Sequence, residues 1–150
     1  MNSEAVRASL VKEAQSWLGT PFHHEACLKG SGVDCGNLLK AVFSASGLPA
    51  PATLPHYPRD FMLHSSKEWF VEIVLQFASE LPEGSSPEPA DVIVFRHGRT
   101  YSHGAIVIAW PEIIHADFDA RAVIRSNAAL EPFLPKKRRL FRHAALRATA

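Results

Sequence analysis

The sequence has few cysteines, no long apolar run and no large excess of charge of one sign. Cys27 and Cys35 are too few for a disulfide framework or for a zinc site built from cysteine alone. No apolar stretch approaches the roughly 20 residues that cross a bilayer, so no membrane span is expected. The formal net charge is only +1, so the molecule lacks the overall basic character of many nucleic-acid-binding proteins, and no nucleic-acid partner is expected.

The N-terminal segment also lacks the pattern of a secretory signal. It carries acids at Glu4 and Glu13 and contains no continuous apolar region. We therefore expect synthesis in the cytoplasm without a signal peptide. Work outside the cytosol would then require separate delivery.

Length and composition favour one globular domain spanning residues 1–150. The chain is 47% hydrophobic and 21% charged, values that are ordinary for a soluble protein, and it shows no internal repeat. Basic residues gather in segment 136–150, which has six Lys and Arg and no acid, leaving a net charge of −5 elsewhere. This segment could attract an anionic polymer, but its interleaved apolar residues favour a strand or helix packed on the body.

Helices are predicted first along the chain and strands afterwards. Helical spacing predicts helices over about residues 3–18, 35–46 and 66–81, with caps at Asn2 or Ser3, at Asp34, and at Ser65 or Ser66. Four prolines between Pro49 and Pro58 predict an extended connector. Alternating apolar residues then predict strands over 91–98, 102–110, 112–118, 121–126 and 138–144. This order indicates an α+β fold with an antiparallel sheet.

Cys35 is the first candidate for chemistry because it follows the predicted helix cap Asp34. The positive end of the helix dipole and the unpaired backbone N–H groups there favour a thiolate, the nucleophilic form. The charge of Asp34 opposes this effect, so an active thiol also needs a basic partner. The alternative is a small buried cysteine that packs the start of the helix.

His103 and His115 are the candidate base and its orienting partner. If strands 102–110 and 112–118 form a hairpin turning about Ala109, the two histidines face each other across it with Cβ atoms about 4.5–5.5 Å apart. A register slip of two residues would make them diagonal neighbours, whereas a slip of one would separate them onto opposite faces. A thiol, a base and a polar orienting residue together indicate nucleophilic catalysis.

Metal binding is the other reading of this set of side chains. The candidate ligands form no CxxC, HxxxH or HExxH pattern, and His23 and His24 would point in opposite directions if extended. No metal and no cofactor are therefore expected.

Three segments, in order, resemble the NlpC family of papain-like cell-wall cysteine peptidases. LGTPFHHEACLKGSGVDCGNLLKAVF is similar to its nucleophile segment, PADVIVFRHGRTYSHGAIVI to its histidine segment, and IIHAD to its third motif. The middle stretch HYPRDFMLHSSKEWFVEIVLQF resembles the insert of phage and prophage members that accompany tail assembly proteins.

The resemblance implies a papain-like fold with Cys35 as nucleophile, His103 as general base and His115 as orienting residue. The backbone N–H of Cys35 would help to bind the oxyanion. It further implies substrate contacts around four residues: Asp34, Phe22, Gly36 and Ser102. The implied substrate is a peptidoglycan stem peptide, often cut between D-glutamate and a diamino acid, with phage tail proteins as further partners.

Two departures from the family pattern concern specificity. Gly36-Asn37 follows the Asp-Cys pair where Ser-Gly or a variable residue and Gly are usual, and Phe22 replaces a usual tyrosine. A structural tail-assembly protein that does not use its thiol, or an amidase toxin, are the alternative functions.

Overall fold

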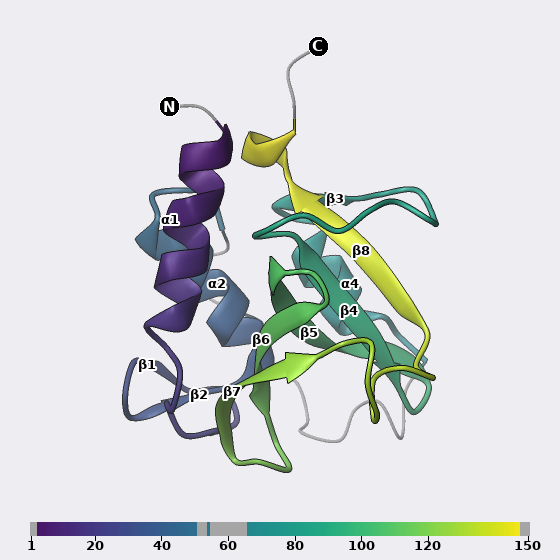
Figure 1. Ribbon diagram of the computed structural model, residues 1–150. Helices are drawn as coiled ribbons and strands as arrows, with labels where there is room; N and C mark the ends of the chain where they lie inside the picture. Colours follow the sequence, from purple (N-terminus) through teal and green to yellow (C-terminus); the bar gives the residue numbers. More distant parts are fainter. Residues whose placement is uncertain (1–2, 51–53, 55–65, 148–150) are drawn as a thin grey trace.

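Three helices and a six-stranded antiparallel sheet make up the fold seen in the computed structural model, which describes residues 3–50, 54 and 66–147 (Figure 1). The sheet order is β3-β8-β4-β5-β6-β7, and every neighbouring pair is antiparallel. The predicted α+β class is confirmed. The elements are α1 Ser3–Gln15, β1 Cys27–Leu28, β2 Gly32–Val33, α2 Cys35–Ala45, α4 Trp69–Val74, β3 Ala78–Glu80, β4 Val92–His97, β5 Thr100–Ala109, β6 Glu112–Asp117, β7 Ala122–Asn127, β8 Arg138–His143 and the 3-10 helix η1 Ala144–Leu146.

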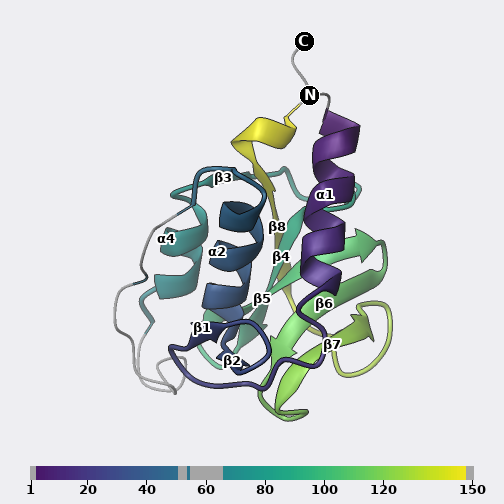
Figure 2. The same cartoon turned by 90° about the vertical axis from the view of Figure 1, so that its left-hand side faces the viewer.

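One face of the sheet carries the helices, which lie side by side across it (Figure 2). Leu10 of α1, Leu38 of α2 and Phe70 of α4 are buried there against sheet residues that include Val94 and Ile106. Gly104 of β5 allows this close packing, because a Cβ atom at that position would overlap the ring of Phe70. No helix in the described ranges combines the length and the apolar character needed to cross a membrane.

The opposite face of the sheet has its own, smaller core. Phe95, Val107 and Ile113 are buried there against Ala128 and Phe133, which belong to the connection between β7 and β8. The rings of Phe95 and Phe133 lie 4.7 Å apart. Because both faces are covered, β4, β5 and β6 are rigidly held, and so are the side chains that they carry.

The second helix begins and ends as the sequence predicts. Asp34 is its N-cap and accepts a hydrogen bond from the backbone N–H of Asn37. Ser46 is the C-cap, and Gly47 follows with a φ of 78°, a left-handed conformation that glycine adopts without strain. The first predicted helix is also present, although it ends at Gln15 and residues 16–19 form turns.

The third predicted helix, over 66–81, is wrong in its extent. The helix covers only Trp69–Val74, its N-cap is Glu68, and Ala78–Glu80 forms the edge strand β3 instead. Helical and extended readings compete here because Phe77 and Ala78 can be buried in either conformation. Pairing with β8, where Ala78 faces His143, decides the outcome. Ser65 and most of the connector between Pro49 and Pro58 lie outside the described residues.

The basic C-terminal segment supplies an internal strand. Strand β8 lies between β3 and β4, which confirms the reading of this segment as an element packed on the body. Arg139 donates to Glu80 over 2.8 and 2.6 Å, and Arg142 donates to the buried carboxylate of Asp91. Much of the basic charge is therefore matched within the sheet. The short β1–β2 hairpin, placed in a predicted loop, was not anticipated.

Candidate active site

Cys35 is the first residue of α2, and its thiol lies against strand β5. The Sγ atom is 3.8 Å from the carbonyl oxygen of Ser102, to which the thiol donates, and the backbone N–H of Gly104 donates to the sulfur. These two contacts lie on either side of His103 in the chain. The helix thus brings the predicted nucleophile to the strand that carries the predicted base.

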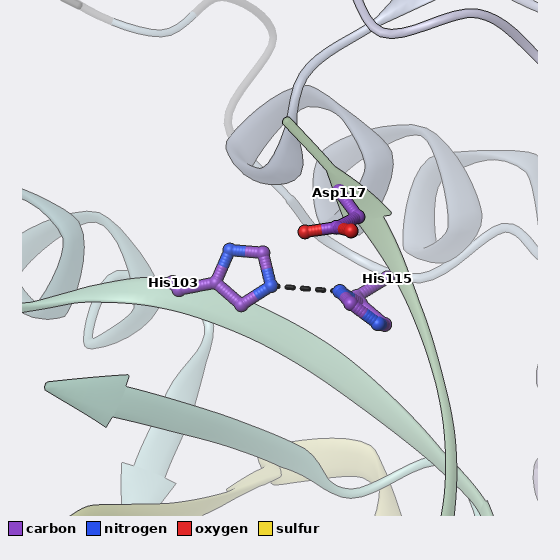
Figure 3. Close-up of side chains that lie close together, drawn as sticks. All are labelled: His103, His115 and Asp117. Atoms are coloured by element: carbon purple, nitrogen blue, oxygen red, sulfur yellow. Dashed lines mark hydrogen bonds between the residues drawn. The ribbon is translucent and has the colours of Figure 1, made fainter. Parts of the chain in front are cut away.

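His103 and His115 are directly hydrogen bonded. Nε2 of His103 is 2.8 Å from Nδ1 of His115, and the two rings are nearly perpendicular, as Figure 3 shows. His115 is only 1% exposed and packs edge-on against Phe133, which also stacks on His103. The pair therefore has a fixed orientation at one end of the smaller core.

The hairpin register differs from the direct pairing predicted for the two histidines. Ile106 pairs with Ile114 and Ala109 with Glu112, because Trp110 and Pro111 form the turn and a bulge follows Val107. Continued along β5, this register makes His103 and His115 diagonal neighbours. Both side chains remain on one face, since the slip is two residues, and the imidazoles still reach each other.

A further polar side chain extends the contact between the two histidines. Nε2 of His115 is 2.7 Å from Oγ of Ser126, which comes from β7. Both ring nitrogens of the buried His115 therefore have a partner. Cys35, His103, His115 and Ser126 come from four elements, α2, β5, β6 and β7, that are distant in sequence or separated by turns.

The comparisons with known proteins agree on the fold. The sequence matches no protein-family model and no curated protein. Among solved structures, NlpC2 from Trichomonas vaginalis has a TM-score of 0.66 at 12% identity over 92% of this chain and 46% of its own. The peptidoglycan hydrolase RipB from Mycobacterium tuberculosis has a TM-score of 0.63 at 15% identity over 94% of this chain and 66% of its own. The NlpC/p60 domain of the peptidoglycan hydrolase SagA has a TM-score of 0.57 at 16% identity over 89% of this chain and 97% of its own.

This chain has the NlpC/P60 fold. The predicted resemblance to the NlpC family is thereby confirmed at the level of architecture. The chain spans less than half the length of the Trichomonas protein. At these identities the likeness establishes the fold alone.

Within the NlpC/P60 fold, burial keeps the resting thiol protonated. Loss of water, together with the nearby charge of Asp34, raises the pKa of Cys35 to about 12, while hydrogen bonds from the backbone N–H groups of Gly104 and Gly36 act in the opposite direction. From the sequence, the helix dipole and the charge of Asp34 were the two opposing influences on this thiol, and burial was not among them. Burial is the largest influence, so the expectation of a favoured thiolate is wrong for the resting protein.

Both histidines are neutral for the same reason. Burial lowers the pKa of His115 to about 4, although Asp117 opposes the shift. Burial also lowers the pKa of His103 well below its usual value, assisted by the charges of His115, His97 and Lys136. The resting thiol of α2 and the imidazole on the adjoining strand β5 are therefore both uncharged, which suits a general base that takes the thiol proton during attack.

The four predicted substrate-binding residues occupy different surroundings. Asp34 is 2% exposed, and its carboxylate accepts hydrogen bonds from the backbone of Glu25 and from Asn37, so it holds the preceding loop to α2. Gly36 lies in the first turn of α2, next to the thiol. Ser102 has a buried hydroxyl that finds no hydrogen-bond partner among the described residues.

Phe22 is the predicted residue that borders open space. It lines a pocket of about 340 Å³ together with Pro21, His23, His24, Phe118 and Arg121. The ring of Phe22 packs edge-on against that of Phe118 at 5.7 Å. The wall that contains His23 is held to β2, the strand before Cys35, because the backbone N–H of His23 donates to the carbonyl of Val33. The wall that contains Phe118 directly follows Asp117, the last residue of β6. Both walls therefore lead to the candidate site.

Sequence reasoning missed Ser126, Asp117 and Phe133 as neighbours of the two histidines. The predicted strand 121–126 includes Ser126, but the sequence did not predict how this strand pairs with 112–118. Phe133 comes from an irregular connection whose path follows from no local pattern. A register argument extended by one more strand would have found Ser126.

Two imidazoles and a carboxylate form the metal-ligand candidate of the described residues. Donor atoms of His103, His115 and Asp117 lie within 4.8 Å of one another (Figure 3). This donor set is acceptable to divalent transition metals. The hydrogen bond between the two histidines already uses one nitrogen of each ring.

Stability should fall in mild acid because His115 is held neutral. The unfolded chain binds a proton on this residue near pH 6.5, whereas the folded protein binds it only near the pKa of about 4. The free energy of unfolding should therefore decrease by about 3 kcal/mol as the pH falls through this window. Urea unfolding between pH 7 and pH 4 measures the slope, and His115→Asn, which cannot take up the proton, should flatten it. Equal slopes for the two proteins would contradict the assignment.

Proposed function

We propose that this protein is a cysteine hydrolase that cleaves amide bonds in the stem peptides of bacterial peptidoglycan, with residues 1–150 acting as a single catalytic domain. The observation that carries the proposal is the position of the Cys35 thiol at a helix N-terminus, against the backbone on both sides of His103, whose ring is held by His115. The solved NlpC/P60 structures with this fold include two described as peptidoglycan hydrolases, which supports the choice of substrate.

The reaction begins with attack of Cys35 on the substrate carbonyl. Nε2 of His103 is occupied by His115, so Nδ1 is the nitrogen that takes the thiol proton as the C–S bond forms. The oxyanion develops near the N-terminus of α2, where the backbone N–H of Cys35 and the helix dipole stabilise negative charge. His103 then returns the proton to the leaving amine, and water releases the acyl group by the same route in reverse.

The pocket beside Phe22 supports a peptide substrate. Its walls combine the rings of Phe22 and Phe118 with the cationic Arg121, so they can accept an apolar side chain and a carboxylate. Stem peptides offer both groups along a short chain. We assign substrate contacts to this pocket and to the turn at Gly36, with the bond between D-glutamate and the diamino acid as the first candidate.

Mass spectrometry of purified peptidoglycan after incubation with the protein tests the proposal. The expected result is new pairs of stem-peptide fragments whose summed mass exceeds that of the parent by one water for each amide cleaved. Unchanged muropeptides from walls of several stem compositions would overturn the choice of substrate. The masses of the fragments identify the bond.

The route by which the protein reaches the cell wall is a separate part of the proposal. The resemblance of HYPRDFMLHSSKEWFVEIVLQF to phage and prophage members supports incorporation into a phage tail as the delivery route to the cell wall. Copurification with tail proteins from a producing strain tests this part. Its failure would leave the hydrolase proposal in place.

A further inference from the structure

His115 differs from a carboxylate in the orienting role because a neutral imidazole can either donate or accept the hydrogen bond to His103. A carboxylate in its place could only accept a hydrogen bond from His103, which would fix the proton on Nε2 of His103. Neutral His115 carries one proton, on either Nδ1 or Nε2. Its 2.8 Å contact with His103 can therefore run in two directions, with opposite consequences for the base.

Only one direction leaves His103 able to accept the thiol proton. If His115 donates from Nδ1, Nε2 of His103 must accept, its proton sits on Nδ1, and that nitrogen has no lone pair for Cys35. If His103 donates from Nε2, its Nδ1 is free to act as a base. The second direction is also required after proton transfer, because the imidazolium of His103 carries N–H groups on both nitrogens and would clash with an N–H on Nδ1 of His115.

We propose that Ser126 is the positioning residue that sets this direction, by accepting a hydrogen bond from Nε2–H of His115. This inference rests on the proposed function. The 2.7 Å contact places Oγ of Ser126 at the only other nitrogen of the ring, so a proton held there leaves Nδ1 as the acceptor for His103. Ser126 is half-buried near the sheet edge, where its own hydroxyl proton can be donated to water.

The charged groups around the pair are compatible with this assignment. Asp117 on β6 lies near both imidazoles, and its charge raises the pKa of His115, against the effect of burial. His97 on β4 stands edge-on to His103 at 5.3 Å, and its charge and that of Lys136 oppose protonation of His103. Among the hydrogen bonds of the described residues, the partner of Nε2 of His115 is Oγ of Ser126. The direction of the hydrogen bond at that nitrogen therefore depends on Ser126.

Two variants of nearly equal shape isolate the hydroxyl. Ser126→Thr keeps it, whereas Ser126→Val replaces it with a methyl group, and both residues suit a β-strand. On a muropeptide substrate we expect kcat to fall about tenfold for Ser126→Val with KM unchanged, and to stay within about twofold for Ser126→Thr. The acid limb of the kcat profile should also move in Ser126→Val and stay in place in Ser126→Thr. Equal kinetics and equal pH profiles for the two variants would overturn the proposal.

Nitrogen-15 NMR of the histidine rings gives a second readout that needs no substrate. His115 should carry its proton on Nε2 in the wild type and in Ser126→Thr, and should become a mixture of tautomers in Ser126→Val. A wild-type proton on Nδ1, or an identical spectrum for both variants, would reject the role of Ser126. If no peptidoglycan is cleaved but the tautomers respond as expected, the choice of substrate is wrong and the role of Ser126 in orienting the histidines is supported.

Discussion

Cys35→Ala should abolish amide hydrolysis and leave the fold intact. The substitution removes the proposed nucleophile, so kcat should fall by at least about a thousandfold, to the level that binding alone provides. Alanine is a good helix former at the first position of α2, and the side chain it replaces is small. Stem-peptide release followed by mass spectrometry measures the loss, and circular dichroism with thermal unfolding measures the fold.

Cys27→Ala is the matched control for this result. Cys27 is the other free cysteine, lies exposed in the short strand β1, and its Sγ atom is 3.8 Å from the carbonyl of Asn37. Because its hydrogen bond is to the backbone of Asn37 and not to either histidine, its replacement should leave kcat within about twofold of the wild type. Loss of folding in Cys35→Ala would instead identify a structural cysteine. Retained hydrolysis in Cys35→Ala would reject the nucleophile.

The parts of the fold that follow from local rules were predictable from the sequence. Asp34 before an apolar helix and Gly47 after it determine α2, and period-two alternation determines β4 to β7. The parts that failed depend on tertiary pairing. The stretch around Phe77 could bury its apolar side chains in a helix or in a strand, and the partner strand that decides the matter lies more than 60 residues later in the chain.

In the candidate site too, features set by local sequence were predictable and features set by tertiary packing were not. The two histidines could be placed on one face because parity along a strand survives a slip of two residues, even though the register itself was wrong. The ionisation of Cys35 could not be predicted, because burial of the thiol depends on how closely α2 packs against β5. The position of Cys35 at the start of a helix follows from nearby sequence, whereas the loss of water around its thiol depends on how the whole chain packs.

Asp91 is the position where one substitution should destabilise the protein most clearly. Its carboxylate is fully buried and accepts hydrogen bonds from Arg142 at 2.9 and 2.8 Å, from Arg7 at 3.2 Å and from the backbone of Glu88 at 2.9 Å. Arg7 belongs to α1 and Arg142 to β8, so this one side chain joins the two ends of the chain to the start of β4. The aspartate that begins this strand is therefore a structural residue.

Asp91→Ala should lower the free energy of unfolding by about 3 kcal/mol, because two largely buried guanidinium groups lose their shared partner. For a domain of this size the melting temperature should fall by about 6–12 °C. Glu80→Ala is the control, since it breaks the more exposed pair with Arg139 and should cost less than about 1 kcal/mol. Urea unfolding of the three proteins decides between a buried network and a surface one. An equal loss in both variants would show that Asp91 contributes no more than an ordinary surface ion pair, and that α1 and β8 are held to the sheet by their apolar contacts alone.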